Sequence, residues 1–382
     1  MVRVVILGQG YVASIFASGL EKIKTGKMEP YGVPLADELP IKIKDIEIVG
    51  SYDVDANKVG KDLYEVVKAY DSEAPESLKG ITVRKGIHLR SLRNLPLKAI
   101  GLEDEMTLKE AVEHLVNEWK ELGAEVFINV CTTEAFQPFE SREELEKAIE
   151  ENNKDRLTAT QVYVYAAAKY AKEVGGAAFV NAIPTLIAND PVFVDLAKES
   201  NLVIFGDDGA TGATPLTADV LSHLAQRNRY VLDIAQFNIG GNNDFLALTD
   251  KERNRSKEFT KSSVVKDLLG YDAPHYIKPT GFLEPLGDKK FIAMHIEYIS
   301  FNGAHDELVI TGRINDSPAL AGLLVDLVRL GKIAIDKKEF GTVYEVNAFY
   351  MKNPGPKERS NIPRIIAHEK MRMWAGLEPR WL

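Results

Sequence analysis

A glycine-rich turn between an apolar stretch and a helical pattern constrains the fold of this chain more than any other feature. Residues 2–7 are mostly apolar and β-branched, and apolar residues recur at helical spacing over residues 14–23. Between them stands the run Gly8-Gln9-Gly10-Tyr11-Val12-Ala13. Glycines at this spacing allow a tight turn and let backbone amides approach a pyrophosphate at the helix N-terminus. We therefore expect a dinucleotide to bind at Gly8, Gly10, Tyr11, Val12 and Ala13.

Short apolar segments and helical patterns alternate through the first half of the chain. Strands are expected at residues 46–52, 125–130, 177–180 and 202–205, and helices at residues 107–122 and 155–173. This alternation is typical of a parallel sheet with helices on both faces. The predicted fold class is therefore α/β, with a Rossmann-type doubly wound parallel sheet.

The pattern changes after about residue 206. Strand-like segments with few helices between them follow at residues 229–239, 275–283, 291–301 and 307–314. They predict an inserted α+β domain with an antiparallel or mixed sheet that is open on one face. Helical patterns return at residues 317–330 and 362–374, and the last helix is expected to dock back on the first domain. We predict a dinucleotide-binding domain of residues 1–209 plus 317–382, and an α+β domain of residues 210–316, to which the family resemblance given below assigns catalysis and tetramer formation.

Polar residues follow the predicted strands where a dinucleotide would lie. Asp53 comes after the second strand, and a carboxylate there holds ribose hydroxyls and repels a 2′-phosphate, which favours NAD over NADP. Asp53 lies further from the turn than the usual distance of about 20 residues, and the loop of residues 26–45 accounts for the excess. Asp55 is the alternative candidate. Thr132 and Thr133 are expected to line the nicotinamide side.

Charge and cysteine content exclude several classes of protein. The formal net charge is −9, whereas nucleic-acid-binding proteins usually carry a basic surplus, so neither nucleic acid nor a membrane is expected as a partner. Cys131 is the one cysteine. This excludes a disulfide framework and indicates a reducing compartment, so we expect the cytoplasm. The Cys131 thiol itself is expected to be buried and unreactive.

Two lysines four residues apart, Lys257 and Lys261, would share one face of a helix and repel each other. Taken alone, the segment is best interpreted as the solvated basic start of a helix, and the alternative is a compensating anion between the two lysines. The surrounding runs favour the anion. They are Asn238-Ile239-Gly240-Gly241-Asn242-Asn243-Asp244 and Arg255-Ser256-Lys257-Glu258-Phe259-Thr260-Lys261-Ser262-Ser263-Val264-Val265.

These two runs resemble the central signature of myo-inositol-1-phosphate synthases, and the chain is most similar to the short, archaeal-like members. Further matches occur in the family's order. They are Gly206-Asp207-Asp208, Thr211-Gly212-Ala213-Thr214, Gly287-Asp288-Lys289-Lys290, Asn315-Asp316-Ser317 and Phe349-Tyr350-Met351-Lys352-Asn353-Pro354. Two positions depart from the pattern. Ala213 replaces a glutamine of the phosphate loop, and Met294 stands where an aspartate is frequent.

The resemblance implies an NAD-dependent isomerase (an intramolecular lyase) of inositol and phospholipid biosynthesis. Such enzymes convert D-glucose 6-phosphate to 1-myo-inositol 1-phosphate by C5 oxidation, enolisation, intramolecular aldol closure and re-reduction, with no net redox. The resemblance also implies a homotetramer that takes a small-molecule substrate. It leaves open whether a divalent or a monovalent cation binds as well.

The resemblance also assigns roles to individual residues. Lys257 is expected to accept the proton of the C5 hydroxyl, because desolvation and neighbouring cations lower the pKa of a lysine. Lys290 and Lys352 are expected to stabilise oxyanions, with Asp316 orienting one of them. The residues expected around the substrate phosphate are Thr211, Gly212, Thr214 and Lys261. Those expected on the cofactor side, besides the residues named above, are Asp208, Asn238 and Asp244.

Two other functions stay open at this point. A sugar or polyol (phosphate) dehydrogenase on the same scaffold would release NADH, and a non-catalytic NAD-binding protein would show no turnover. The set of lysines argues against both, because plain hydride transfer needs one base and a binding module needs none.

Overall fold

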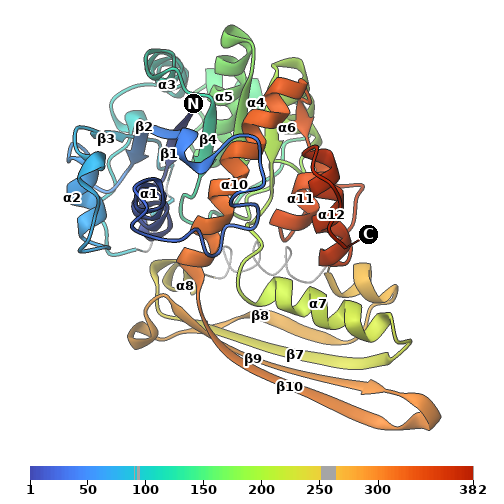
Figure 1. Cartoon of the computed structure of the whole chain (residues 1–382). Coiled ribbons are helices and arrows are strands. Elements are labelled where there is room, and N and C mark those ends of the chain that lie inside the picture. Colours follow the sequence, from blue (N-terminus) through green and yellow to red (C-terminus); the bar gives the residue numbers. More distant parts are fainter. Residues whose placement is uncertain (90, 93–94, 251–263, 382) are drawn as a thin grey trace.

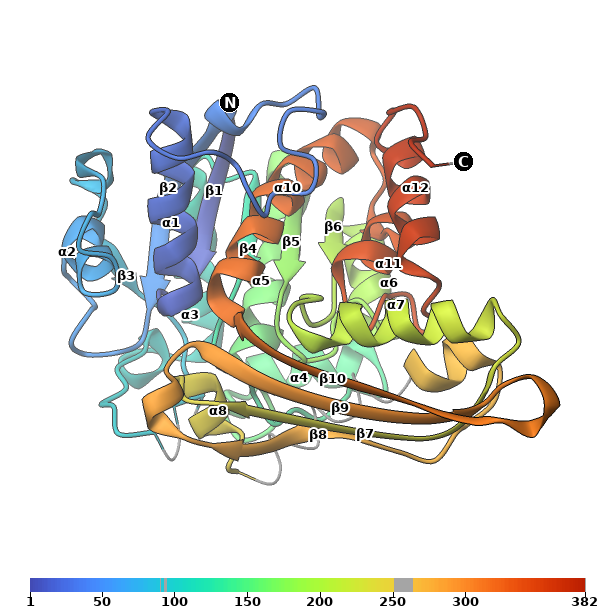
Figure 2. The same cartoon turned by 60° about the horizontal axis from the view of Figure 1, so that its bottom comes forward.

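The computed structural model describes residues 1–89, 91–92, 95–250 and 264–381, which form two sheets with helices packed on them (Figure 1). The larger sheet carries helices on both faces. The smaller sheet lies across the end of the larger one (Figure 2).

The larger sheet has the Rossmann strand order. Its strands are β1 (Val2–Leu7), β2 (Ile46–Asp53), β3 (Val83–Lys85), β4 (Val126–Asn129), β5 (Ala177–Asn181), β6 (Leu202–Phe205) and β11 (Gly341–Thr342). They run in the order β11-β6-β5-β4-β1-β2-β3, and each described pair is parallel. The order reverses between β1 and β4, where doubly wound sheets bind ligands. The predicted fold class is confirmed.

Two hydrophobic cores lie on opposite faces of this sheet. Helices α1 (Tyr11–Lys24) and α10 (Asp316–Lys337) cover one face, and α3 (Leu108–Leu122), α5 (Ala159–Val174) and α6 (Pro191–Glu199) cover the other. In β1, Val4 and Ile6 join the first core while Val5 and Leu7 join the second. Strands buried on both faces read as continuous apolar runs, which explains why β1 was recognisable in the sequence.

Caps set the ends of the helices. Thr107 and Glu110 form a capping box at the start of α3, and Gly123 ends that helix with φ +59°. The helix predicted from residue 155 begins only at Ala159, because Thr158 and Gln161 cap it reciprocally. Other α-helices among the described residues are α2 (Leu63–Lys68), α4 (Arg142–Glu150), α7 (Ala213–Ala225), α8 (Asn243–Ala247), α11 (Tyr344–Tyr350) and α12 (Arg364–Trp374), and residues 264–269 are helical as well. None of the helices that the structure describes is long and apolar enough to cross a bilayer.

The smaller sheet contains β7 (Tyr230–Gly240), β8 (His275–Phe282), β9 (Lys289–Ile299) and β10 (His305–Asn315), in the order β10-β9-β7-β8. It is mixed, since β7 pairs with β8 in parallel while β9 pairs with β7 and β10 antiparallel. Helix α7 covers one face (Figure 2), and Met294 is buried beneath it. The other face leaves Phe237, Tyr276 and Val309 exposed. The sheet is therefore of the predicted kind, whereas the proposed domain boundaries stay a prediction.

Candidate active site

The glycine turn has the shape that a pyrophosphate requires. Gly8 has φ +95°, and a Cβ there would lie 2.9 Å from the backbone of Cys131, so only glycine fits. A Cβ on Gly10 would meet nothing within 4 Å, which leaves open space beside the N-terminus of α1. Ala13 is fully buried, so it packs the helix and does not face a ligand. These features fit a bound dinucleotide.

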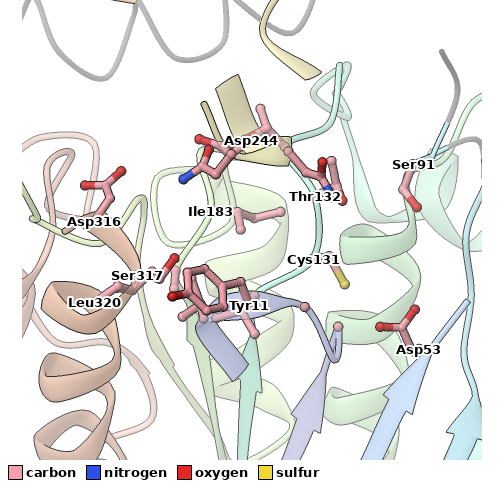
Figure 3. A pocket seen from close by; sticks show the side chains of 18 of the residues that line it. Tyr11, Asp53, Ser91, Cys131, Thr132, Ile183, Asp244, Asp316, Ser317 and Leu320 are labelled. Carbon is pink, nitrogen blue, oxygen red and sulfur yellow. Dashed lines mark hydrogen bonds between the residues drawn. The ribbon is translucent and has the colours of Figure 1, made fainter. Parts of the chain in front are cut away.

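The turn opens into a cavity of about 440 Å³ that extends from Asp53 to the start of α10. Figure 3 shows Tyr11, Thr132, Asp244 and Asp316 gathered around it from different elements. The predicted site residues that line it are Gly8, Gly10, Tyr11, Val12, Asp53, Thr132, Thr133, Asp208, Thr211, Asp244, Asp316 and Lys352. A small adjoining pocket adds Thr214, Asn238 and Lys290. Thr211, Asp244, Asp316 and Lys352 line both pockets, so the two groups of predicted residues lie next to each other.

Asp53 is held rigidly at one end of the cavity. Its Oδ1 accepts from the amides of Val54 (2.6 Å) and Asp55 (2.8 Å), and Lys58 Nζ lies 3.4 Å from its Oδ2. The alternative candidate, Asp55, also lines the cavity, but its Oδ1 accepts from the backbone and side chain of Asn57. Both carboxylates thus line the cavity with one oxygen bound by neighbouring groups, and the choice of Asp53 for the ribose stays a prediction.

Two buried lysine–aspartate pairs lie at the other end. Lys290 Nζ donates to Asp316 Oδ1 at 2.7 Å, and Thr211 Oγ1 donates to the same oxygen at 3.3 Å. Lys352 Nζ donates to Asp208 Oδ1 at 2.8 Å. Both ammonium groups belong to side chains that are less than 10% exposed. Charges so buried act on a ligand with little screening by water.

Backbone pairing explains how Lys352 reaches Asp208. The amide of Lys352 donates to the carbonyl of Asp208, while residues 207 and 353 exchange two further backbone bonds. Asp207 anchors this junction, because its carboxylate accepts from the amides of residues 187–189 and from Asn181 Nδ2. Burial raises the pKa of Asp207 to about 6, against the lowering effect of these donors.

The loop expected to hold a phosphate forms the start of α7. Gly212 precedes the helix with φ +63°, and a Cβ there would lie 2.6 Å from Lys290 Nζ. Thr211 and Thr214 flank it and are buried. The helix N-terminus, two hydroxyls and an ammonium thus converge on one small space, an arrangement that suits an anion. Ala213, at the position where the family pattern has glutamine, lines the same pocket.

Asp244 links the loop after β4 to the segment that follows β7. Thr133 Oγ1 donates to Asp244 Oδ1 at 2.8 Å, so the loop after β4 is tied to α8. Asn238 lies within the smaller sheet, where its amide nitrogen donates to the carbonyl of Lys278. Of the two pockets, it lines only the small one.

Several residues of the cavity were not predicted from the sequence. Asp288 accepts from Asn242 Nδ2 and from both the amide and the hydroxyl of Ser317, and so joins three segments of the site. It stands in the Gly287-Asp288-Lys289-Lys290 run, which was the available signal. Lys58, Tyr70 and Ser91 also line the cavity and carried no motif.

Three further predictions concerned the lysines of the central run, Cys131 and Met294. Lys257 and Lys261 lie outside the described residues. Cys131 is partly buried, and burial raises its pKa well above the ordinary value, as expected for an unreactive thiol. Met294 lies in the core under α7, so its departure from the family pattern does not alter the lining of the cavity.

Comparison with known proteins supports the family resemblance seen in the sequence. Residues 212–317 match the family model described as myo-inositol-1-phosphate synthase. An inositol-3-phosphate synthase of Mycobacterium tuberculosis is 30% identical over 381 residues, covering 96% of this chain and 95% of the relative. One from Corynebacterium glutamicum is 29% identical, covering 97% of each chain.

Solved structures agree with these sequence matches. A myo-inositol-1-phosphate synthase-related protein from Thermotoga maritima is 74% identical with a TM-score of 0.97, covering 100% of each chain. The inositol-3-phosphate synthase of Caenorhabditis elegans has a TM-score of 0.81 at 17% identity, covering 100% of this chain and 86% of that one. The second likeness shows that the fold is shared.

Proposed function

The chain belongs to the myo-inositol-1-phosphate synthase family, and from this premise we propose that it converts D-glucose 6-phosphate to 1-myo-inositol 1-phosphate with NAD and without net redox. One observation carries the proposal. In two lysine–aspartate pairs, Lys352–Asp208 and Lys290–Asp316, both members of the first and Asp316 of the second line the cavity into which the glycine turn opens, and Lys290 lines the adjoining pocket. A cofactor bound at the turn would therefore reach the same space as these cations.

The two ammonium groups suit the carbon–carbon bond-forming part of the reaction. An enolate and an aldol alkoxide both carry negative charge on oxygen, and preorganised cations in a dry site stabilise such charge strongly. Asp316 and Asp208 hold Lys290 and Lys352 in place by direct hydrogen bonds. A simple dehydrogenase has no comparable need, because it moves a single hydroxyl proton.

The substrate phosphate would lie at the N-terminus of α7. Thr211, the backbone around Gly212, and Thr214 supply neutral donors there, and Lys290 supplies charge. Lys261 and the proposed base Lys257 belong to the residues outside the description, so their roles stay predictions from the family resemblance.

The cofactor would lie along the carboxyl ends of β1, β2 and β4. Gly8 and Gly10 would give room to its pyrophosphate, Asp53 would hold the adenosine ribose, and Tyr11, Val12, Thr132 and Thr133 would enclose the nicotinamide half. When bound, NAD supplies the oxidation at C5 and the final reduction. The sugar would lie at the end of this cavity that Asp208, Asp316 and Lys352 line.

The open face of the smaller sheet suits contact with other copies of the chain. Phe237, Tyr276 and Val309 are 43–69% exposed on it. Exposed apolar side chains on one sheet face are typical of an interface between subunits. We therefore propose a homotetramer formed through this sheet, with the cytoplasm as its compartment.

The proposal is tested by incubating the purified protein with glucose 6-phosphate and NAD. Phosphorus NMR identifies the product while absorbance follows NADH. Inositol 1-phosphate without accumulation of NADH is expected. Accumulation of NADH with an open-chain product would assign a dehydrogenase, and tight NAD binding without turnover would assign a binding protein.

A further inference from the structure

Lys58 lies in the cofactor cavity although no motif marks it. Its ammonium donates to the carbonyl of Gln9, inside the glycine turn, at 3.0 Å and lies 3.4 Å from Asp53 Oδ2. The side chain is only 17% exposed, so the charge faces the cavity and the turn instead of bulk water.

Local structure fixes Lys58 in this position. The amides of Lys58 and Val59 donate to the carbonyl of Asp55, which closes a turn after β2 and directs the lysine back toward β1. The ammonium also lies 5.7 Å from the ring centre of Tyr70, which packs against Tyr11 at 5.5 Å. Burial acts to lower the pKa of Lys58, but Asp53 and Tyr70 outweigh it and the pKa is raised, so the ammonium stays charged.

Lys58 and Asp53 form an ion pair at the edge of the cavity. Asp53 Oδ1 is occupied by two backbone amides, and Oδ2 faces Lys58. In this state the carboxylate neutralises the ammonium on the ribose side, while the carbonyl of Gln9 holds it near the turn. A dinucleotide pyrophosphate at Gly8 and Gly10 would pass within reach of the same ammonium.

We propose that Lys58 is a cofactor-binding residue whose ion pair with Asp53 determines the preference for NAD over NADP. The inference rests on the proposed function only in placing a dinucleotide in this cavity. With Asp53 present, Lys58 attracts the pyrophosphate of NAD. The 2′-phosphate of NADP would be repelled by the Asp53 carboxylate. Without the Asp53 charge, Lys58 is released toward the 2′-phosphate, and NADP becomes a ligand.

Direct titration of NAD and NADP by calorimetry tests this without any turnover. The variants are K58M, D53N and the double variant D53N/K58M, with K61M as the control, because Lys61 is exposed and does not line the cavity. The side-chain carbonyl that D53N introduces can still accept from the two backbone amides, so this variant should fold, and thermal unfolding of each variant checks this.

We expect K58M to weaken NAD binding about tenfold, as for the loss of one charge-assisted contact, and K61M to leave it unchanged. D53N should raise NADP affinity relative to NAD at least about tenfold, and the double variant should lose that gain. An equal gain in NADP affinity in D53N and D53N/K58M would overturn the role of Lys58, and so would an unaltered NAD affinity in K58M. Failure of the wild-type protein to bind either dinucleotide would instead overturn the cofactor assignment.

Discussion

Lys352 and Asp208 form a buried ion pair with 2.8 Å between Nζ and Oδ1, although 144 residues separate them in the chain. The backbone of residues 207–208 pairs with that of residues 352–353, so the contact is built into the framework and not left to side-chain flexibility. The pair lies where the loop after β6 meets the segment after α11.

Replacing Lys352 with methionine should lower kcat about 100- to 1,000-fold, because it removes one preorganised cation from the oxyanions. It should also destabilise the fold by about 3–5 kcal/mol, because Asp208 keeps a buried charge without its ammonium. Steady-state kinetics and urea unfolding measure the two effects.

The variant K147M is the control, since the Lys147 side chain is 70% exposed and remote from the cavity. The double variant D208N/K352M should regain stability but not activity. Full activity in K352M would show that the Lys352–Asp208 pair is not needed for catalysis.

Gly212→Ala should impair substrate binding and turnover together. The new Cβ would lie 2.6 Å from Lys290 Nζ, which must then leave Asp316. We expect kcat/KM for glucose 6-phosphate to fall about 100-fold, as for other small displacements of catalytic groups. Gly270→Ala is the matched control, because Gly270 also has positive φ (+79°) but open space around its Cβ. Gly270→Ala should lose about 1 kcal/mol of stability and Gly212→Ala more, because ψ −124° at Gly212 lies outside the left-handed helical region. Equal activity in the two variants would contradict the account.

Glu134 gives a prediction about pH. Its carboxylate is buried beside Thr133 and accepts from Thr185 Oγ1 at 3.1 Å, and burial raises its pKa. Just above the ordinary glutamate pKa of about 4.3, Glu134 is therefore still protonated in the folded protein but ionised in the unfolded chain. As pH rises from about 4.3 to the raised pKa of the folded state, Glu134 lowers the free energy of unfolding. The free energy of unfolding of the wild-type protein should therefore fall relative to that of E134Q as pH rises above about 4. A pH-independent difference would refute this.

The open sheet face predicts an effect on assembly. Val309 is 69% exposed on the outer face of β10, and a lysine there should reduce the mass measured by light scattering below that of a tetramer. Val174→Lys is the control, because Val174 is 46% exposed at the end of α5, on the other sheet. An unchanged mass for V309K, or a monomeric wild-type protein, would exclude this interface.

Local patterns were enough to predict the framework of the fold. Continuous apolar runs gave β1 and β4–β6, because these strands are buried on both faces. Positive φ at Gly8 is a local requirement, so the turn was visible from the glycine itself. The start of α5 was misjudged by a few residues, because reciprocal capping by Thr158 and Gln161 overrode the apolar spacing.

The contacts within the site depend on distant parts of the chain and were less predictable. Family motifs placed Lys290, Asp316, Lys352 and Asp208 in the site, but not their pairing, which results from how β9, α10 and residues 352–353 meet. Lys58 carried no motif, since its significance comes from the fold of one turn onto the carbonyl of Gln9. Burial, too, was invisible at Met294, which packs under α7.

The central claim is that oxidation and reduction occur within one closed cycle on one sugar. The direct test uses glucose 6-phosphate with deuterium at C5, NAD and an added pool of unlabelled NADH, and mass spectrometry of the product. We expect inositol 1-phosphate that retains the deuterium, because the label returns to the same molecule before any cofactor exchanges. Deuterium appearing in free NADH, without a cyclic product, would contradict the account.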